Sequence, residues 1–237
     1  DEMVAVDVLL GRRAGKSAPD IVLLIVDATN LQRNFYLVSQ VLSCGLPTVV
    51  ALNMVDIAQE RGIEIDVKKL AAKLGTPVVA IQANRGQGIP ELKAALLSAS
   101  QSTPAKSENP FPAEFIDQAL GLSSRLDSNL KLPLPLFLVE RLILDGNGYL
   151  EDQLLPINAH AEREYLQSVR QSLSQHGFPI PAGEAMARYA WVGRTLEDVV
   201  RTPTERRLTL SDRIDAVLVH KLWGTLVLLA VMALLFS

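Results

Sequence analysis

An asparagine and an aspartate, Asn53 and Asp56, follow the apolar run of residues 47–52. This pattern is typical of a buried parallel strand that delivers polar side chains to the edge where open α/β sheets bind ligands. The carboxylate can accept two hydrogen bonds from the N1–H and exocyclic amine of guanine, while the Asn amide braces the neighbouring loop. Adenine has no matching pair of donors, so a buried Asp56 would stay unpaired beside it, at a cost of about 1–3 kcal/mol.

The corresponding motif of most GTPases is Asn-Lys-x-Asp, in which the Lys stem covers the base. Met54 takes the Lys place here, and a Met side chain can cover a base face by dispersion. After the next strand, Gln82, Ala83 and Asn84 stand where GTPases carry a Ser-Ala loop, whose Ala N–H donates to guanine O6. A backbone donor survives side-chain changes, whereas Gln82 in place of Ser weakens the loop. The candidate guanine-nucleotide site comprises Asn53, Met54, Asp56, Gln82, Ala83 and Asn84, with no catalytic or metal-ligating residue assigned.

A simpler interpretation of both motifs is a capped strand end and an ordinary glycine-rich turn. A second glycine-rich stretch, residues 11–17, has only three residues between its glycines, and a phosphate loop needs four. It also follows a predicted helix at 2–11 and runs into a strand, which is the reverse of the phosphate-loop order. We therefore interpret it as a connecting loop.

The first hundred residues alternate strand and helix patterns, which predicts an α/β fold: the C-terminal half of a P-loop GTPase-like, doubly wound parallel sheet. The predicted strands are 21–26, 47–52 and 77–81, and the predicted helices are 31–42, 67–74 and 89–97. The run at 21–26 is continuously apolar and β-branched, which predicts burial on both faces. Thr29 or Asn30 is expected to cap the helix that follows.

A linker rich in Ser, Pro and Ala at 98–112 is followed by helical periodicity and by no further strand pattern. The predicted helices of this all-α region are 115–126, 136–144, 161–173 and 185–200. The predicted organisation is a partial G domain at 1–100, a helical domain at 111–208, a juxtamembrane helix at 209–221 and the start of a transmembrane helix at 222–237.

The last sixteen residues, 222–237, carry no charge. A membrane span needs about 20 residues and at least ~17, so this run is slightly short. Lys221 and Trp223 suit a membrane interface, and positive flanks favour a cytoplasmic amino-terminal side. We expect the first helix of a membrane region here, and the alternative is a buried core helix.

Composition excludes some functions. The net charge of −3 and the aromatic content of 5% give no basis for nucleic acid binding. The single cysteine, Cys44, excludes an intrachain disulfide and fits a reducing compartment.

Together these motifs resemble the ferrous iron transport protein B (FeoB) family, in which Met at the Lys position is usual. The resemblance covers essentially the whole chain and rests on Asp27 to Asn34, Ala51 to Asp56, Arg188-Tyr189, Ser211 to Asp215, His220 and Trp223-Gly224. Gln82 departs from the GTPase pattern.

The resemblance implies a transporter of the bacterial cell inner membrane, with residues 1–221 in the cytoplasm and Fe²⁺ as the transported ion. It implies a GTPase domain that binds GTP and GDP, with Mg²⁺ only in the complete protein, and a helical domain likened to a guanine nucleotide dissociation inhibitor. The implied partners are guanine nucleotide and the lipid bilayer, with self-association and small accessory iron-transport proteins as further candidates.

On this interpretation the chain begins shortly after the Asp-x-x-Gly switch and ends inside the first span. Phosphoryl transfer depends on phosphate cradling and Mg²⁺, so the chain alone is expected not to hydrolyse GTP. Two alternatives stay open: a soluble GTPase of another family with a helical accessory domain, and a non-catalytic, membrane-tethered interaction domain.

Overall fold

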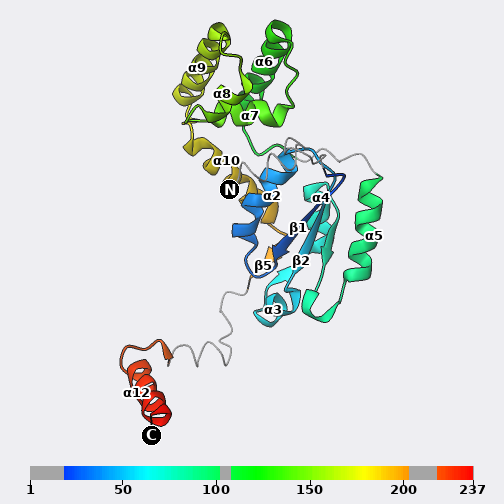
Figure 1. The fold of residues 1–237 in the computed structure, drawn as a ribbon. Helices are drawn as coiled ribbons and strands as arrows, with labels where there is room; N and C mark the ends of the chain where they lie inside the picture. The colour runs from blue at the N-terminus through cyan, green and yellow to red at the C-terminus, as the bar shows by residue number, and fades with distance from the viewer. Residues whose placement is uncertain (1–18, 102–107, 203–217, 237) are drawn as a thin grey trace.

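The computed structural model describes residues 19–101, 108–202 and 218–236, which form an α/β unit, a helical bundle and a separate short helix (Figure 1). The predicted helix at 2–11, the glycine-rich stretch at 11–17 and most of the predicted juxtamembrane helix lie outside the described residues.

Three parallel strands form the sheet of the α/β unit, in the order β1-β2-β4. Their bounds are β1 Val22–Asp27, β2 Thr48–Asn53 and β4 Val78–Ala80. Helices α2 (Leu31–Ser43) and α4 (Val67–Leu74) pack on one face, and α5 (Ile89–Ser100) packs on the other. Helices on both faces of a parallel sheet confirm the doubly wound prediction.

The first two strands have similar sequences but different surroundings. All of β2 except its last residue is buried, whereas Leu23 and Ile25 of β1 are 38% and 65% exposed. In the parallel register Leu23 pairs with Val49 and Ile25 with Ala51, so both side chains lie on the face where α5 packs on β2 and β4. The prediction that β1 is buried on both faces is wrong for the described structure, because α5 does not cover this edge strand.

The helical bundle contains the predicted helices and one short helix that the periodicity did not indicate, α8. The helices are α6 Ala113–Leu130, α7 Leu136–Leu144, α8 Tyr149–Leu154, α9 His160–Gln175 and α10 Ala182–Leu196. A core that includes Phe115, Leu142 and Leu166 holds α6, α7 and α9 together.

Helix α10 contributes to two hydrophobic cores. Ala187 packs against the core of the helical bundle, whereas Trp191, Val192 and Leu196 belong to the core between the sheet, α2 and α4. A two-residue strand, β5 (Val200–Arg201), follows and pairs antiparallel with β3 (Glu64–Ile65). The expectation of no strand beyond the linker is therefore wrong, because a strand this short shows no period in the sequence.

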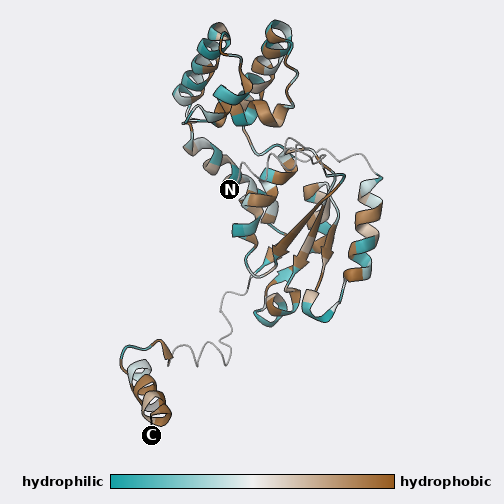
Figure 2. Ribbon diagram, viewed as in Figure 1, coloured by the Kyte–Doolittle hydropathy of each residue, from teal (hydrophilic) through white to brown (hydrophobic). Residues whose placement is uncertain are grey.

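The carboxyl-terminal apolar run forms helix α12, Trp223–Leu235. It has thirteen residues, most of them hydrophobic (Figure 2). Most of these hydrophobic side chains are exposed. Among the described helices, none combines the length and the apolar character that a bilayer crossing requires.

Candidate functional site

The carboxyl ends of the three parallel strands meet at one edge of the sheet, where most of the candidate residues lie. The backbone N–H of Ala28, just after β1, donates to the carbonyl of Asn53 at 2.9 Å. The N–H of Ile81, just after β4, donates to the carbonyl of Leu52 at 2.7 Å. These bonds hold the loops after all three strands side by side, as the parallel-sheet pattern predicts.

Asn53 joins two of these loops through its side chain. It is the last residue of β2, and its Oδ1 accepts a hydrogen bond from the backbone N–H of Ala83 at 3.1 Å. The two residues are 30 positions apart in the chain. The structure therefore brings together Asn53 and the loop of residues 82–84, in the bracing arrangement that the sequence suggested.

Met54 is the N-cap of the short helix α3 (Val55–Glu60), which the sequence did not reveal. Met54 adopts a left-handed conformation, with φ of 60° and ψ of 33°, and is 42% exposed. A non-glycine residue rarely adopts this conformation, which turns the chain sharply from strand to helix. Asp56 lies half-buried in the first helical turn, and its carboxylate has no hydrogen-bond or ion-pair partner in the described part of the chain.

The loop after β4 is closed by its own backbone. The N–H of Gln82 donates to the carbonyl of Gln87 at 3.0 Å, and the N–H of Gln87 donates to the carbonyl of Gln82 at 3.2 Å. Between them, Ala83–Arg85 form a 3₁₀ turn, η1, with exposed side chains that include Asn84. The backbone pair does not depend on the Gln82 side chain, so the weakening of the loop by Gln82 stays a prediction.

Two details constrain this loop further. The side-chain oxygen Oε1 of Gln82 is buried without a hydrogen-bond partner among the described residues. Gly88, with φ of +78°, lies so close to the carbonyl oxygen of Ala80 that a Cβ would overlap it. A glycine is required there, and it brings the first turn of α5 against the end of β4.

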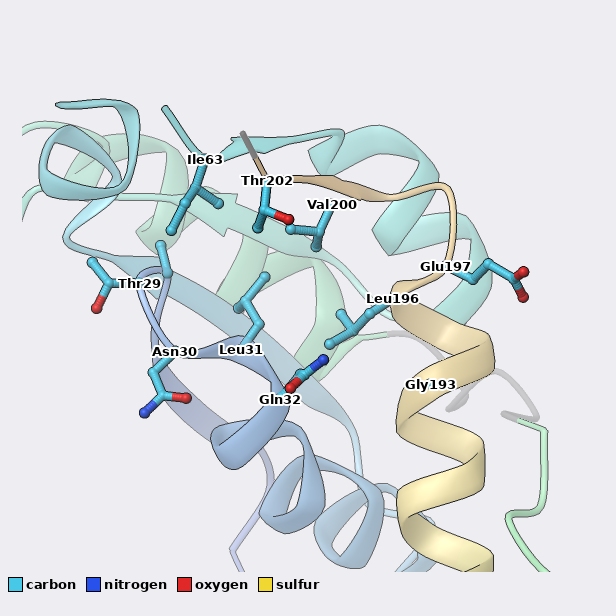
Figure 3. Close-up of a pocket in the computed structure, with 11 residues that line it drawn as sticks. Thr29, Asn30, Leu31, Gln32, Ile63, Gly193, Leu196, Glu197, Val200 and Thr202 are labelled. Carbon is cyan, nitrogen blue, oxygen red and sulfur yellow. The ribbon is translucent and has the colours of Figure 1, made fainter. Parts of the chain in front are cut away.

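A cavity of about 620 Å³ lies near these loops but does not contain the six candidate residues. Figure 3 shows the loop after β1 on one side and the end of α10 and strand β5 on another. Asn30 occupies the N-cap position of α2 without a side-chain capping bond, and the N–H of Thr29 donates to Asp27 Oδ1 at 2.8 Å. The predicted N-cap position at Asn30 is confirmed, but its side chain makes no capping hydrogen bond. Sequence reasoning gave no signal for this cavity, since its walls come from segments far apart in the chain.

Known proteins are similar to this chain over its whole length. The family model described as Ferrous iron transport protein B matches residues 1–96. The Fe(2+) transporter FeoB of Escherichia coli (strain K12) is 31% identical over 242 residues, which cover 100% of this chain and 29% of that protein. The Fe(2+) transport protein A/Fe(2+) transporter FeoB fusion protein of Porphyromonas gingivalis is 30% identical over 235 residues, covering 94% of this chain and 27% of that protein. The chain thus spans less than a third of the length of these curated relatives.

Solved structures of FeoB proteins are also similar to this chain. The cytosolic domain of L. pneumophila FeoB matches with a TM-score of 0.63 and 28% identity, covering 85% of this chain and 73% of that one. The mGMPPNP-bound NFeoB from S. thermophilus matches with a TM-score of 0.68 and 26% identity, covering 87% and 74%. The chain therefore belongs to the ferrous iron transport protein B family.

Proposed function

We propose that this chain is the guanine-nucleotide-binding, regulatory part of a ferrous iron membrane transporter, and that Asn53, Asp56 and Ala83 read the base. The observation that carries the proposal is the hydrogen bond from the Ala83 N–H to Asn53 Oδ1, 3.1 Å long. It joins the two loops that a guanine site requires at the carboxyl edge of a parallel sheet. The nucleotide bound to the related S. thermophilus structure supports the same ligand class.

Each candidate residue has a distinct role in this proposal. The carboxylate of Asp56, which has no partner among the described residues, accepts hydrogen bonds from the N1–H and exocyclic amine of guanine. The Ala83 N–H is shared between Asn53 Oδ1 and guanine O6, since one N–H can serve two acceptors. Met54, exposed in its left-handed turn, covers one face of the base. Gln82 and Asn84 belong to the loop that carries Ala83. The buried Gln82 Oε1 is a further hydrogen-bond acceptor in this loop.

The base-reading residues supply no phosphate cradle and no Mg²⁺ ligand, so this part of the site does not by itself transfer a phosphoryl group. In the complete transporter we propose that GTP and Mg²⁺ are bound with additional segments, and that Fe²⁺ is cargo rather than a resident metal. We further propose an inner-membrane location with residues 1–221 in the cytoplasm and residues 222–237 beginning the membrane region. Self-association and small accessory iron-transport proteins remain proposed partners.

The test compares nucleotides that differ only at the edge that Asp56 reads. The variant Asp56→Asn should lose at least about 10-fold of the preference for GDP over xanthosine diphosphate, because xanthine replaces the amine with a carbonyl that an amide can pair. Calorimetric titration at millimolar nucleotide measures both affinities. The control is Asp66→Asn, which removes the same charge from the N-cap of α4 and keeps a capping side chain. An unchanged affinity ratio in Asp56→Asn contradicts the assignment.

A further inference from the structure

Strand β5 follows α10 and pairs with β3, the strand that comes after helix α3 and Asp56. It pairs antiparallel with β3, and just beyond the pair the N–H of Asp66 donates to the carbonyl of Val199 at 2.9 Å. We call residues 64–65 and 200–201 the β3–β5 ribbon. In the sequence the apolar residues 222–237 follow the ribbon, and β5 is the last of the described strands.

A compact hydrogen-bonded turn links the base-reading residues to this ribbon. Asp56 lies in the first turn of α3, which has only six residues. At the end of α3, the N–H of Gly62 donates to the carbonyl of Gln59 at 2.9 Å, and the N–H of Ile63 donates to that of Ala58 at 2.8 Å. Strand β3 begins at the next residue. These bonds connect the end of α3 to the start of β3 without a long loop between them.

The other strand of the ribbon is tied to α4 and α10. Lys73 of α4 donates from its Nζ to the carbonyls of Arg194 and Glu197, at 2.8 and 2.7 Å. These carbonyls lie at the carboxyl end of α10, where the last backbone carbonyls of a helix have no intrahelical donor. Lys69, one turn earlier, donates to the carbonyl of Asp198 at 3.3 Å. The two lysines therefore hold the α10–β5 turn against the element that follows β3.

The ribbon has free space on one side. The cavity of about 620 Å³ separates it from the loop after β1. Its walls on the ribbon side include Ile63, Val200 and Thr202, and those on the loop side include Thr29, Asn30 and Leu31 (Figure 3). A packed core resists small shifts, and Ile65 and Val200 pack against one. The cavity is therefore the direction in which the ribbon meets the least resistance.

We propose that the β3–β5 ribbon couples the occupancy of the base site to the position of strand β5. A bound base fixes the first turn of α3, α3 fixes β3, and β3 fixes β5. Coupling between two sites is reciprocal, so loosening β5 also loosens α3. The nucleotide half of this inference rests on the proposed function, whereas the link between β5 and α3 does not.

The first experiment breaks the ribbon without nucleotide. Arg201 is exposed and pairs with Glu64, and Arg201→Pro removes a backbone donor from the strand while leaving the core intact. Hydrogen exchange of the full chain should become at least ~10-fold faster in residues 55–66, with α6 and α9 unchanged. The matched control Arg201→Ala keeps the backbone N–H and should exchange as the wild type does. Faster exchange in β5 with unchanged exchange in α3 overturns the proposal.

The double variant Glu64→Cys/Arg201→Cys covers the case in which Arg201→Pro does not fold. These residues lie directly opposite each other, and their disulfide should slow exchange in residues 55–63 relative to the reduced form. Equal exchange in the oxidised and reduced forms overturns the proposal.

The last experiment adds millimolar GDP to the wild-type chain. We expect slower exchange at residues 54–63 and also at 199–201, with both effects absent in Asp56→Asn. Protection of residues 54–63 without protection of 199–201 overturns the coupling. If GDP protects neither segment, the proposed function is contradicted. The two ribbon variants, which need no nucleotide, then test the link between β5 and α3 by themselves.

Discussion

Two polar clusters of this chain differ in their surroundings: the exposed edge that holds Asn53 and Ala83, and a buried junction between α2, α7 and α10. In the junction, Arg188 of α10 is 1% exposed, and its guanidinium donates to Glu184 Oε1 at 2.8 Å and to Ser39 Oγ at 3.1 Å. At the edge, the Asp56 carboxylate has no partner among the described residues. The junction pairs most of its polar groups internally, with Arg141 Nε as a buried exception among the described residues, whereas the edge leaves the Asp56 carboxylate available to a ligand.

The junction also contains a buried carboxyl group, Glu140 of α7, which is 3% exposed. Asn109 donates a hydrogen bond from Nδ2 to its Oε1 at 2.8 Å. Burial raises the pKa of Glu140, while the Asn109 bond and the charges of Arg188 and Arg141 act in the opposite direction. The ring of Phe111 lies 5.1 Å from the Arg188 guanidinium carbon and covers it from the linker side.

This difference indicates which cluster contributes to the free energy of folding and which to the free energy of ligand binding. Satisfied buried polar groups contribute to folding, because removal of one partner leaves the others without water or protein contacts. Unsatisfied polar groups at an exposed edge contribute little to folding, since water replaces any missing partner. Mutations in the junction should therefore change stability, and mutations at the edge should change binding.

The largest expected effect is that of Arg188→Ala. Removing the buried cation leaves Glu184 with Arg141 as its remaining cation and takes a donor from Ser39 Oγ. The loss of a buried ion-pair partner typically costs about 3–5 kcal/mol. Urea unfolding followed by circular dichroism measures the free energy. The matched control is Arg194→Ala on the same helix, because Arg194 pairs with Glu108 on the surface and exposed pairs contribute at most about 1 kcal/mol. Similar losses in both variants would show that the junction is no more important than a surface ion pair.

The two clusters also differ in how far the sequence revealed them. Asn53 and Ala83 were predictable, because each follows an apolar strand and parallel strands bring their carboxyl ends together. The Arg188–Ser39 contact joins residues 149 positions apart, and no local spacing indicates it. The exposure of Ile25 was missed for a similar reason: it depends on how far α5 extends over the sheet, which is a property of tertiary packing.

A smaller effect is expected for Asn53→Ala at the edge. Loss of the bond to the Ala83 N–H should lower the free energy of unfolding by about 0.5–1.5 kcal/mol, since water can solvate the freed donor. The same variant should weaken GDP and xanthosine diphosphate binding together, because the bracing of the loop serves both bases. Unfolding and calorimetric titrations provide the two measurements. A loss of stability as large as that of Arg188→Ala would contradict the distinction between the clusters.

The smallest effect is expected for Glu140→Gln, which keeps the volume of the side chain and an acceptor for Asn109. A carboxyl whose pKa is raised on folding binds its proton more tightly in the folded state. Its contribution to stability is therefore fully present below its ordinary pKa of 4.5 and is lost as pH rises through the raised pKa.

Glutamine does not titrate, so the stability of the wild type relative to Glu140→Gln should fall as pH rises from about 4 to 8. Urea unfolding of both proteins across this range gives the difference, in which titrations common to both proteins largely cancel. The exposed Glu164→Gln is the control, and its difference from the wild type should stay nearly constant. A difference that rises with pH for Glu140→Gln would mean that the Arg188 and Arg141 charges outweigh burial, and that the junction holds Glu140 as a fully paired carboxylate.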